Sequence, residues 1–163
     1  MDDDCRPDPS WTYELVMSFI QMHEAIILSG MTYAIGDTEF DKIHDKEGTL
    51  NGRKFIDEDF LLYGPTCNLS VTRTVANTLA FDTSYPEAAC EDVDFCLRAL
   101  QNGYKICHAP SRKVLHDYGY GDYCCNAKTI MKRAVNGTLV VRRYCRNVFQ
   151  AIGHIMRKRK KSL

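Results

Sequence analysis

Residues 91–103 constrain the fold more than any other segment, because their pattern is that of a helix with one buried face and a defined end. The apolar residues follow the i, i+3, i+4, i+7 spacing of an amphipathic helix; they are Val93, Cys96, Leu97 and Leu100. Gly103 comes directly after this pattern, and glycine ends helices because it takes a left-handed conformation without a Cβ clash. The sequence therefore predicts a helix from about residue 91 to residue 102, packed on a core.

Helical and strand patterns alternate along the rest of the chain. The predicted helices cover Pro9–Met22, Thr74–Leu79, Tyr123–Ala134 and Thr138–Lys160. The predicted strands cover Ala25–Ile35, as one or two strands around Gly30, and Leu61–Ser70, Tyr104–His108 and Lys113–His116. Residues 36–59 are the most polar stretch, and we expect a long mobile insertion there, with a turn at residues 50–52. Alternating strands and helices predict the α/β class, with a mixed sheet flanked by helices.

The charge is divided sharply between two parts of the chain. Residues 1–122 hold 10 basic and all 21 acidic residues, a net charge of −11, whereas residues 123–163 hold 11 basic and no acidic residues, a net charge of +11. We therefore predict a main domain over 1–122 and a basic helical extension over 123–163. The extension has an apolar side, so two interpretations stay open: it lies on an anionic membrane surface, or it covers the core of the main domain. Its basic face has no interleaved aromatic residues, so we expect no nucleic-acid partner.

Cysteine usage and the start of the sequence bear on the compartment. The eight cysteines include no C-x-x-C pair and no zinc-finger spacing, so we expect reduced thiols that fill small apolar sites. The sequence opens with acidic rather than basic and then apolar residues, and no run of about 18 apolar residues follows. The expectation is a cytoplasmic protein, with peripheral membrane contact as the variant that the basic extension allows.

Carboxylates gather at two places. Asp2 and Asp4 stand one residue apart, and paired oxygen donors suit Mg²⁺ or Mn²⁺; an exposed acidic terminus is the alternative. Glu91 and Asp92 fall in the first turn of the predicted helix, where the helix dipole favours anions in any protein. Asp94 stands four residues before Arg98, and an ion pair between them is our preferred interpretation of Asp94.

Several motifs, in this order and at these distances, resemble those of family 2 glycosyltransferases with the GT-A fold, from their Asp-x-Asp motif onward. The matching motifs are Asp2-Asp3-Asp4 followed by Pro7, Pro9 and Trp11; Gly64 to Asn68 with Arg73; Phe81-Asp82 with Pro86; Glu91-Asp92-Val93-Asp94 with Arg98; Gly103-Tyr104; and Val114-Leu115-His116. The resemblance covers nearly all of residues 2–137. It implies a partial GT-A fold, because the strands that precede Asp-x-Asp in the family have no counterpart before Asp2.

The resemblance implies the transfer of a sugar from a nucleotide-diphosphate donor to a saccharide or lipid-linked acceptor hydroxyl. Asp92 matches the catalytic base, and Asp4 and His116 match ligands of Mn²⁺ or Mg²⁺. Residues expected at the donor and cofactor are Asp2, Asp4, Cys67, Asn68, Glu91 and His116. The Gln-x-x-Arg-Trp motif of processive members does not occur in the sequence, so single sugars would be added.

Structural roles compete with these assignments. His116 ends a predicted strand, where a histidine without any catalytic role is common, and residues 64–68 could form a plain strand-ending turn. Two further functions stay open for the whole chain: a truncated, non-catalytic remnant of such an enzyme, and a module that docks on a membrane or partner through its basic extension.

Overall fold

The computed structural model describes residues 2–22, 27–55, 60–85, 90–118 and 135. The chain divides into two units, one of residues 1–82 with 92–124 and the other of residues 83–91 with 125–163. The fold reported below is that of the first unit. The two helices predicted over 123–134 and 138–160, with the basic extension they form, lie outside the described residues.

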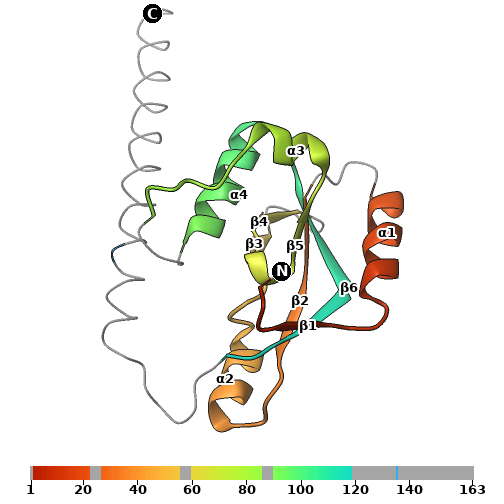
Figure 1. Cartoon of the computed structure of the whole chain (residues 1–163), viewed down its shortest axis with the longest axis vertical. Coiled ribbons are helices and arrows are strands. Elements are labelled where there is room, and N and C mark those ends of the chain that lie inside the picture. Colours follow the sequence, from red (N-terminus) through yellow and green to blue (C-terminus); the bar gives the residue numbers. More distant parts are fainter. Residues whose placement is uncertain (1, 23–26, 56–59, 86–89, 119–134, 136–163) are drawn as a thin grey trace, which may run out of the picture. The chain divides into compact units, whose positions relative to one another are not determined.

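A four-stranded mixed sheet forms the centre of this unit (Figure 1). In spatial order its strands are β1 (Cys5–Pro7), β6 (Ile106–His116), β2 (Ile27–Ala34) and β5 (Leu69–Val71). The two long central strands β2 and β6 run parallel, and the short outer strands pair antiparallel with them. Strands β3 (Arg53–Phe55) and β4 (Leu61–Tyr63) form a separate antiparallel pair.

Helices cover both faces of the main sheet. Neighbouring residues of a strand point to opposite faces, so the apolar residues of β2 need a cover on each side. Ile27 packs in one core cluster with Phe95 of α4 (Glu91–Gln101) and Val75 of α3 (Arg73–Thr78). Leu28 faces the other way, into a cluster covered by residues of α1 (Trp11–Gln21). The predicted helices over 91–102, 74–79 and 9–22 and the α/β class are thus confirmed, and each helix end lies within two residues of its predicted position.

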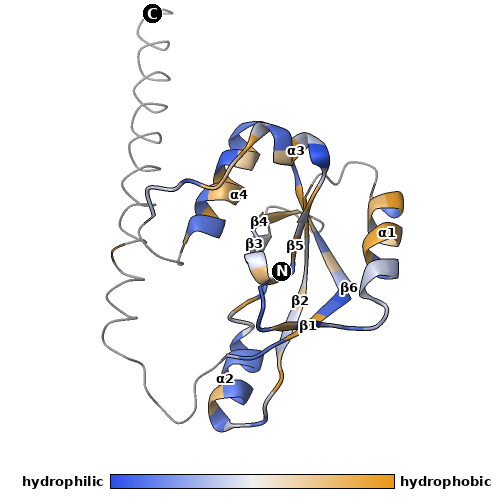
Figure 2. Cartoon of the chain, viewed as in Figure 1, coloured by the Kyte–Doolittle hydropathy of each residue, from blue (hydrophilic) through white to orange (hydrophobic). Residues whose placement is uncertain are grey.

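Helix α1 is rich in apolar residues, and much of its ribbon is orange in Figure 2. Leu15, Phe19 and Met22, next to its last residue, face the sheet, whereas Tyr13, Val16 and Ile20 are each more than half exposed. Among the described residues no helix combines the length and the apolar character needed to cross a membrane.

The prediction of a mobile insertion over 36–59 is wrong for residues 39–55. Helix α2 (Glu39–Glu47) begins with a capping box, in which the Thr38 hydroxyl accepts a hydrogen bond from the backbone N–H of Asp41 and the Asp41 carboxylate accepts one from that of Thr38. Gly48 ends the helix in the left-handed conformation. Polar composition hid this helix, although its start and stop signals are present in the sequence.

The same segment covers an edge of strand β2 with side chains in place of another strand. The Asn51 amide accepts a hydrogen bond from Thr32 N–H at 2.6 Å and donates one to Thr32 C=O at 3.2 Å. The Asp45 carboxylate accepts from Ala34 N–H at 2.7 Å. Backbone groups at a sheet edge need such partners, so this segment is part of the fold.

Two strand predictions need correction. The two strands predicted over 104–108 and 113–116 form one strand, β6, which begins at Ile106 and whose pairing with β2 shifts between Gly30 and Met31. Pro110 lies within this irregularity, where a strand tolerates a residue without an N–H donor. Residues 61–70, predicted as one strand, divide into β4, a 3₁₀ turn (Thr66–Asn68) and the start of β5. Residues 25–35, predicted as one or two strands around Gly30, contain the one strand β2.

Candidate metal centre

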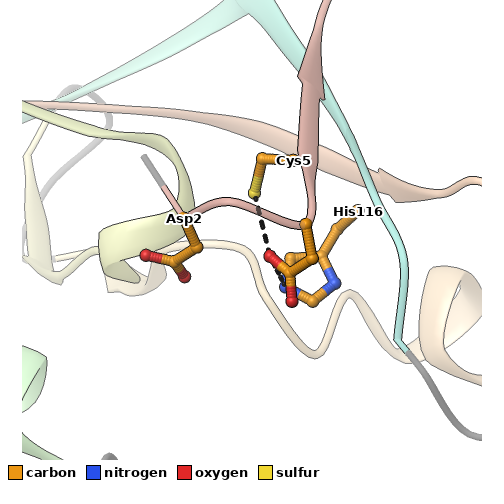
Figure 3. A group of neighbouring side chains, drawn as sticks. Asp2, Cys5 and His116 are labelled. Atoms are coloured by element: carbon orange, nitrogen blue, oxygen red, sulfur yellow. Dashed lines mark hydrogen bonds and ion pairs between the residues drawn. The ribbon is translucent and has the colours of Figure 1, made fainter.

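Strand pairing brings the beginning of the chain to the end of β6. Cys5 is the register partner of His116, and the backbone N–H of Asp117 donates to Asp4 C=O at 3.0 Å. As a result, ligand atoms of Asp2, Asp4, Cys5 and His116 all lie within 4.8 Å of one another (Figure 3). We call these four residues the N-terminal cluster.

The side chains of Asp4, Cys5 and His116 contact one another through one carboxylate oxygen of Asp4. His116 Nε2 lies 3.4 Å from Asp4 Oδ1, and Cys5 Sγ lies 3.7 Å from the same oxygen. The His116 side chain is only 12% exposed, whereas that of Asp4 is 44% exposed, so the cluster has a buried wall and an open side. His116 Nδ1 is buried without a hydrogen-bond partner among the described residues, which leaves Nε2 as the nitrogen that faces the cluster.

A row of aromatic rings packs next to the imidazole of His116. The His116 ring lies 5.0 Å from the ring of Tyr118, which stacks on His44 of α2 at 4.7 Å, and Phe40 follows at 4.1 Å from His44. Burial, with the charges of Asp45 and Asp41 among further causes, raises the pKa of Tyr118 to about 12, so its hydroxyl is neutral at physiological pH.

The Cys5 thiol of the cluster and the nearby Cys67 thiol are protonated at neutral pH. Burial is the main cause that raises the pKa of Cys5 to about 12 and that of Cys67 to about 11. Cys5 Sγ also lies 3.8 Å from Cys67 C=O, which accepts from the thiol, and Cys67 Sγ lies 3.5 Å from Thr32 Oγ1. Five cysteines of the described residues have no disulfide partner; they are Cys5, Cys67, Cys90, Cys96 and Cys107.

The donor set of the N-terminal cluster fits a divalent cation. Two carboxylates and one imidazole offer negative charge and unshared electron pairs, and carboxylate oxygens are the usual protein ligands of Mg²⁺ and Mn²⁺. Around an octahedral ion with bonds of about 2.1 Å, adjacent ligand atoms lie about 3.0 Å apart and opposite ones about 4.2 Å apart. The separation of His116 Nε2 and Asp4 Oδ1, 3.4 Å, lies between these two values. Asp4 and His116 are both predicted metal ligands. They lie side by side in the structure, although 112 positions separate them in the sequence.

Asp92, the predicted base, lies in the first turn of α4, where its Oδ1 accepts from the backbone N–H of Val93 at 2.7 Å. The charges of Asp2 and Asp92 both help to raise the pKa of Cys67, so both carboxylates are within electrostatic range of this one thiol. Glu91, predicted at the cofactor, is the first residue of α4. The ion pair expected for Asp94 is confirmed: Arg98 Nε donates to Asp94 Oδ2 at 2.8 Å, and the Asp94 side chain is fully buried.

Asn68 and Cys67, both predicted at the donor and cofactor, are buried in the fold. Asn68 is 2% exposed, and its side chain makes four hydrogen bonds within the protein. Its Oδ1 accepts from Trp11 Nε1 and Arg112 NH2, and its Nδ2 donates to Met31 C=O and Arg112 C=O, at 2.9 to 3.0 Å. Cys67 is buried as well. The cofactor-binding role of both residues stays a prediction, and the Asn68 amide has an evident structural role.

Sequence reasoning missed two residues of this region. Arg112 is fully buried over the Trp11 ring, and burial lowers its pKa to about 10. A lone arginine after a proline turn carries no signal for such burial. Cys5 is the second missed residue, and its position directly after Asp4 is a visible sign that its sulfur could join the carboxylates.

Comparisons of the chain with protein-family models, with curated proteins and with solved structures give no match. The structure itself shows a mixed α/β unit in which helices flank a mixed sheet.

Proposed function

We propose that the protein transfers a sugar from a nucleotide-diphosphate donor to an acceptor hydroxyl in a reaction that depends on a divalent cation. The observation that supports this most is the meeting of Asp2, Asp4 and His116 in one cluster. The motif resemblance had assigned these three residues to the metal and the donor, and chain folding alone brings them together.

In this proposal each residue has a defined task. Asp4 and His116 hold Mn²⁺ or Mg²⁺, and Asp2 contacts the donor beside them. The cation offsets the charge that develops on the leaving diphosphate. Asp92 takes the proton of the acceptor hydroxyl as its oxygen bonds to the sugar C1 atom and the bond from C1 to the diphosphate breaks, with inversion at C1.

Cation binding is the first test, because it needs no knowledge of the donor. Binding of Mn²⁺ to the full chain is followed by the loss of the electron paramagnetic resonance signal of the free ion. Asp4→Asn removes a charged ligand and should weaken binding at least tenfold. Asp3→Asn is the matched control, because Asp3 lies between two cluster members without belonging to the cluster, and it should bind Mn²⁺ like the wild type.

Donor cleavage is the second test. A panel of nucleotide-diphosphate sugars is incubated with the chain, Mn²⁺ and simple saccharide acceptors, and release of the nucleotide diphosphate is measured. Asp92→Asn should abolish release and leave Mn²⁺ affinity within about threefold of the wild type, since Asp92 is not a cluster ligand. Equal turnover in wild type and Asp92→Asn would refute the assignment of the base. Cation binding without cleavage of any donor would favour a non-catalytic chain.

A further inference from the structure

The N-terminal cluster contains a sulfur atom that the proposed transfer reaction does not use. Cys5 Sγ lies 3.7 Å from Asp4 Oδ1, and Figure 3 shows Cys5 together with Asp2 and His116. The strand register fixes this position, because Cys5 is paired directly with His116 across β1 and β6. One sulfur, one imidazole nitrogen and two carboxylate oxygens thus lie within 4.8 Å of one another.

Two separations within the N-terminal cluster are close to those of tetrahedral coordination. With Zn–N and Zn–O bonds of about 2.0 Å and a Zn–S bond of about 2.3 Å, tetrahedral angles place nitrogen and oxygen about 3.3 Å apart and sulfur and oxygen about 3.5 Å apart. The cluster has 3.4 Å between His116 Nε2 and Asp4 Oδ1, and 3.7 Å between Cys5 Sγ and that oxygen. Adjacent ligands of an octahedral Mg²⁺ are closer, at about 3.0 Å.

The chemistry of the four donors also separates two classes of cation. Thiolate and imidazole favour Zn²⁺, whereas Mn²⁺ and Mg²⁺ prefer oxygen ligands and gain little from sulfur. We infer that Asp2, Asp4, Cys5 and His116 form a four-ligand zinc site, in which Cys5 is the ligand that selects Zn²⁺. As the Zn–S bond forms, the S–H bond of Cys5 breaks and its proton goes to solvent.

This site has a consequence for catalysis, which rests on the proposed function. Four protein ligands complete the coordination of Zn²⁺ and leave no position for a diphosphate oxygen, as in structural zinc sites. Mn²⁺ held by Asp4 and His116 keeps open positions for the donor. Zinc would therefore inhibit the transfer reaction by occupying the same place, and Cys5 would make the enzyme sensitive to zinc.

Direct zinc binding tests the inference without any donor. The full chain is titrated with Zn²⁺ in competition with a chromogenic chelator, under reducing conditions. We expect Cys5→Ser to weaken zinc binding at least about 100-fold. Loss of a residue that only hydrogen-bonds to a metal ligand costs about 10- to 100-fold, and Cys5 is itself a ligand in this proposal. Mn²⁺ affinity of Cys5→Ser should stay within about threefold of the wild type, since Mn²⁺ does not need the sulfur. Cys90→Ser, at a partly buried cysteine outside the cluster, is the matched control and should bind zinc normally.

A spectroscopic readout on the unmodified chain covers the case in which a variant folds poorly. Co²⁺ added in place of Zn²⁺ should give a thiolate-to-cobalt charge-transfer band, together with the strong visible bands of tetrahedral Co²⁺. Both sets of bands should be lost in Cys5→Ser and kept in Cys90→Ser.

The outcomes separate the two proposals. Mn²⁺ binding with no zinc site, or equal zinc affinity in Cys5→Ser and wild type, would overturn the zinc inference and leave the transfer proposal standing. Zinc binding that depends on Cys5, without cleavage of any donor, would support the zinc site and count against the transfer proposal.

Discussion

Replacement of Asn68 by alanine is the perturbation for which the structure gives the clearest expectation. The Asn68 amide accepts from Trp11 Nε1 and Arg112 NH2, and donates to the backbone carbonyls of Met31 and Arg112. These partners belong to α1, β2 and β6, so one side chain connects three elements. Arg112 NH2 keeps its bond to Asn68 C=O in the variant, because that acceptor is in the backbone.

The magnitude follows from the groups left without a partner. Asn68→Ala removes the partner of one indole N–H and of two carbonyl oxygens; each such group costs about 1–3 kcal/mol when it is buried and less where water reaches it. The Trp11 and Met31 groups are partly buried and the Arg112 carbonyl is buried. We therefore expect a loss of about 3–5 kcal/mol in the free energy of unfolding, a large share of the 5–15 kcal/mol typical of a folded domain.

Urea unfolding, followed by tryptophan fluorescence, measures this loss. The sequence has a single tryptophan, Trp11, and it donates to Asn68, so the probe reports on the affected region. With a slope of about 2 kcal/mol per molar urea, the midpoint should fall by about 2 M. Asn77→Ala, at an exposed position of α3, is the matched control and should change stability by less than about 0.5 kcal/mol, because alanine favours helix.

A small effect would refute this reasoning. If Asn68→Ala unfolds with a loss below about 1 kcal/mol, the four hydrogen bonds do not carry the stability assigned to them. If the same variant also loses donor binding, the Asn68 side chain belongs to the site, as the motif resemblance implied, rather than to the structural network.

Three further predictions use the same unfolding assay. Gly30→Ala should cost about 3 kcal/mol, because a Cβ there would overlap the Asn68 amide and a backbone carbonyl of β6; a neutral result would mean that the two strands separate without cost. Thr38→Ala should cost about 1 kcal/mol through loss of the capping box of α2, and an unchanged midpoint would show that α2 contributes nothing to cooperative unfolding. Burial lowers the pKa of His108, so the folded state binds fewer protons than the unfolded state, and stability should fall as pH decreases from 7.5 to 5.5. His108→Gln should show a smaller decrease, and an equal decrease would assign the pH dependence to other groups.

Local signals were sufficient for the elements with strong periodicity. The apolar spacing of residues 93–100 and the glycine at 103 predicted α4. Few structures other than a helix with one buried face require both this spacing and a glycine just after it. The Asp94–Arg98 pair followed from helical spacing in the same way. For residues 39–47, overall polarity favours a mobile loop, whereas the end signals at Thr38 and Gly48 favour a helix. The structure has the helix, α2, so the prediction from polarity is wrong.

Long-range relations required the folded chain. The sequence by itself determined the residue types at the N-terminal cluster: two carboxylates and a thiol within residues 2–5, and a histidine at the end of a strand. The tertiary structure alone decided that Cys5 lies opposite His116, because strand register depends on how β1 pairs with β6 and no local pattern encodes that pairing. The burial of Arg112 beside Asn68 was likewise decided by packing, since a charged side chain is placed in a core only where distant partners meet it.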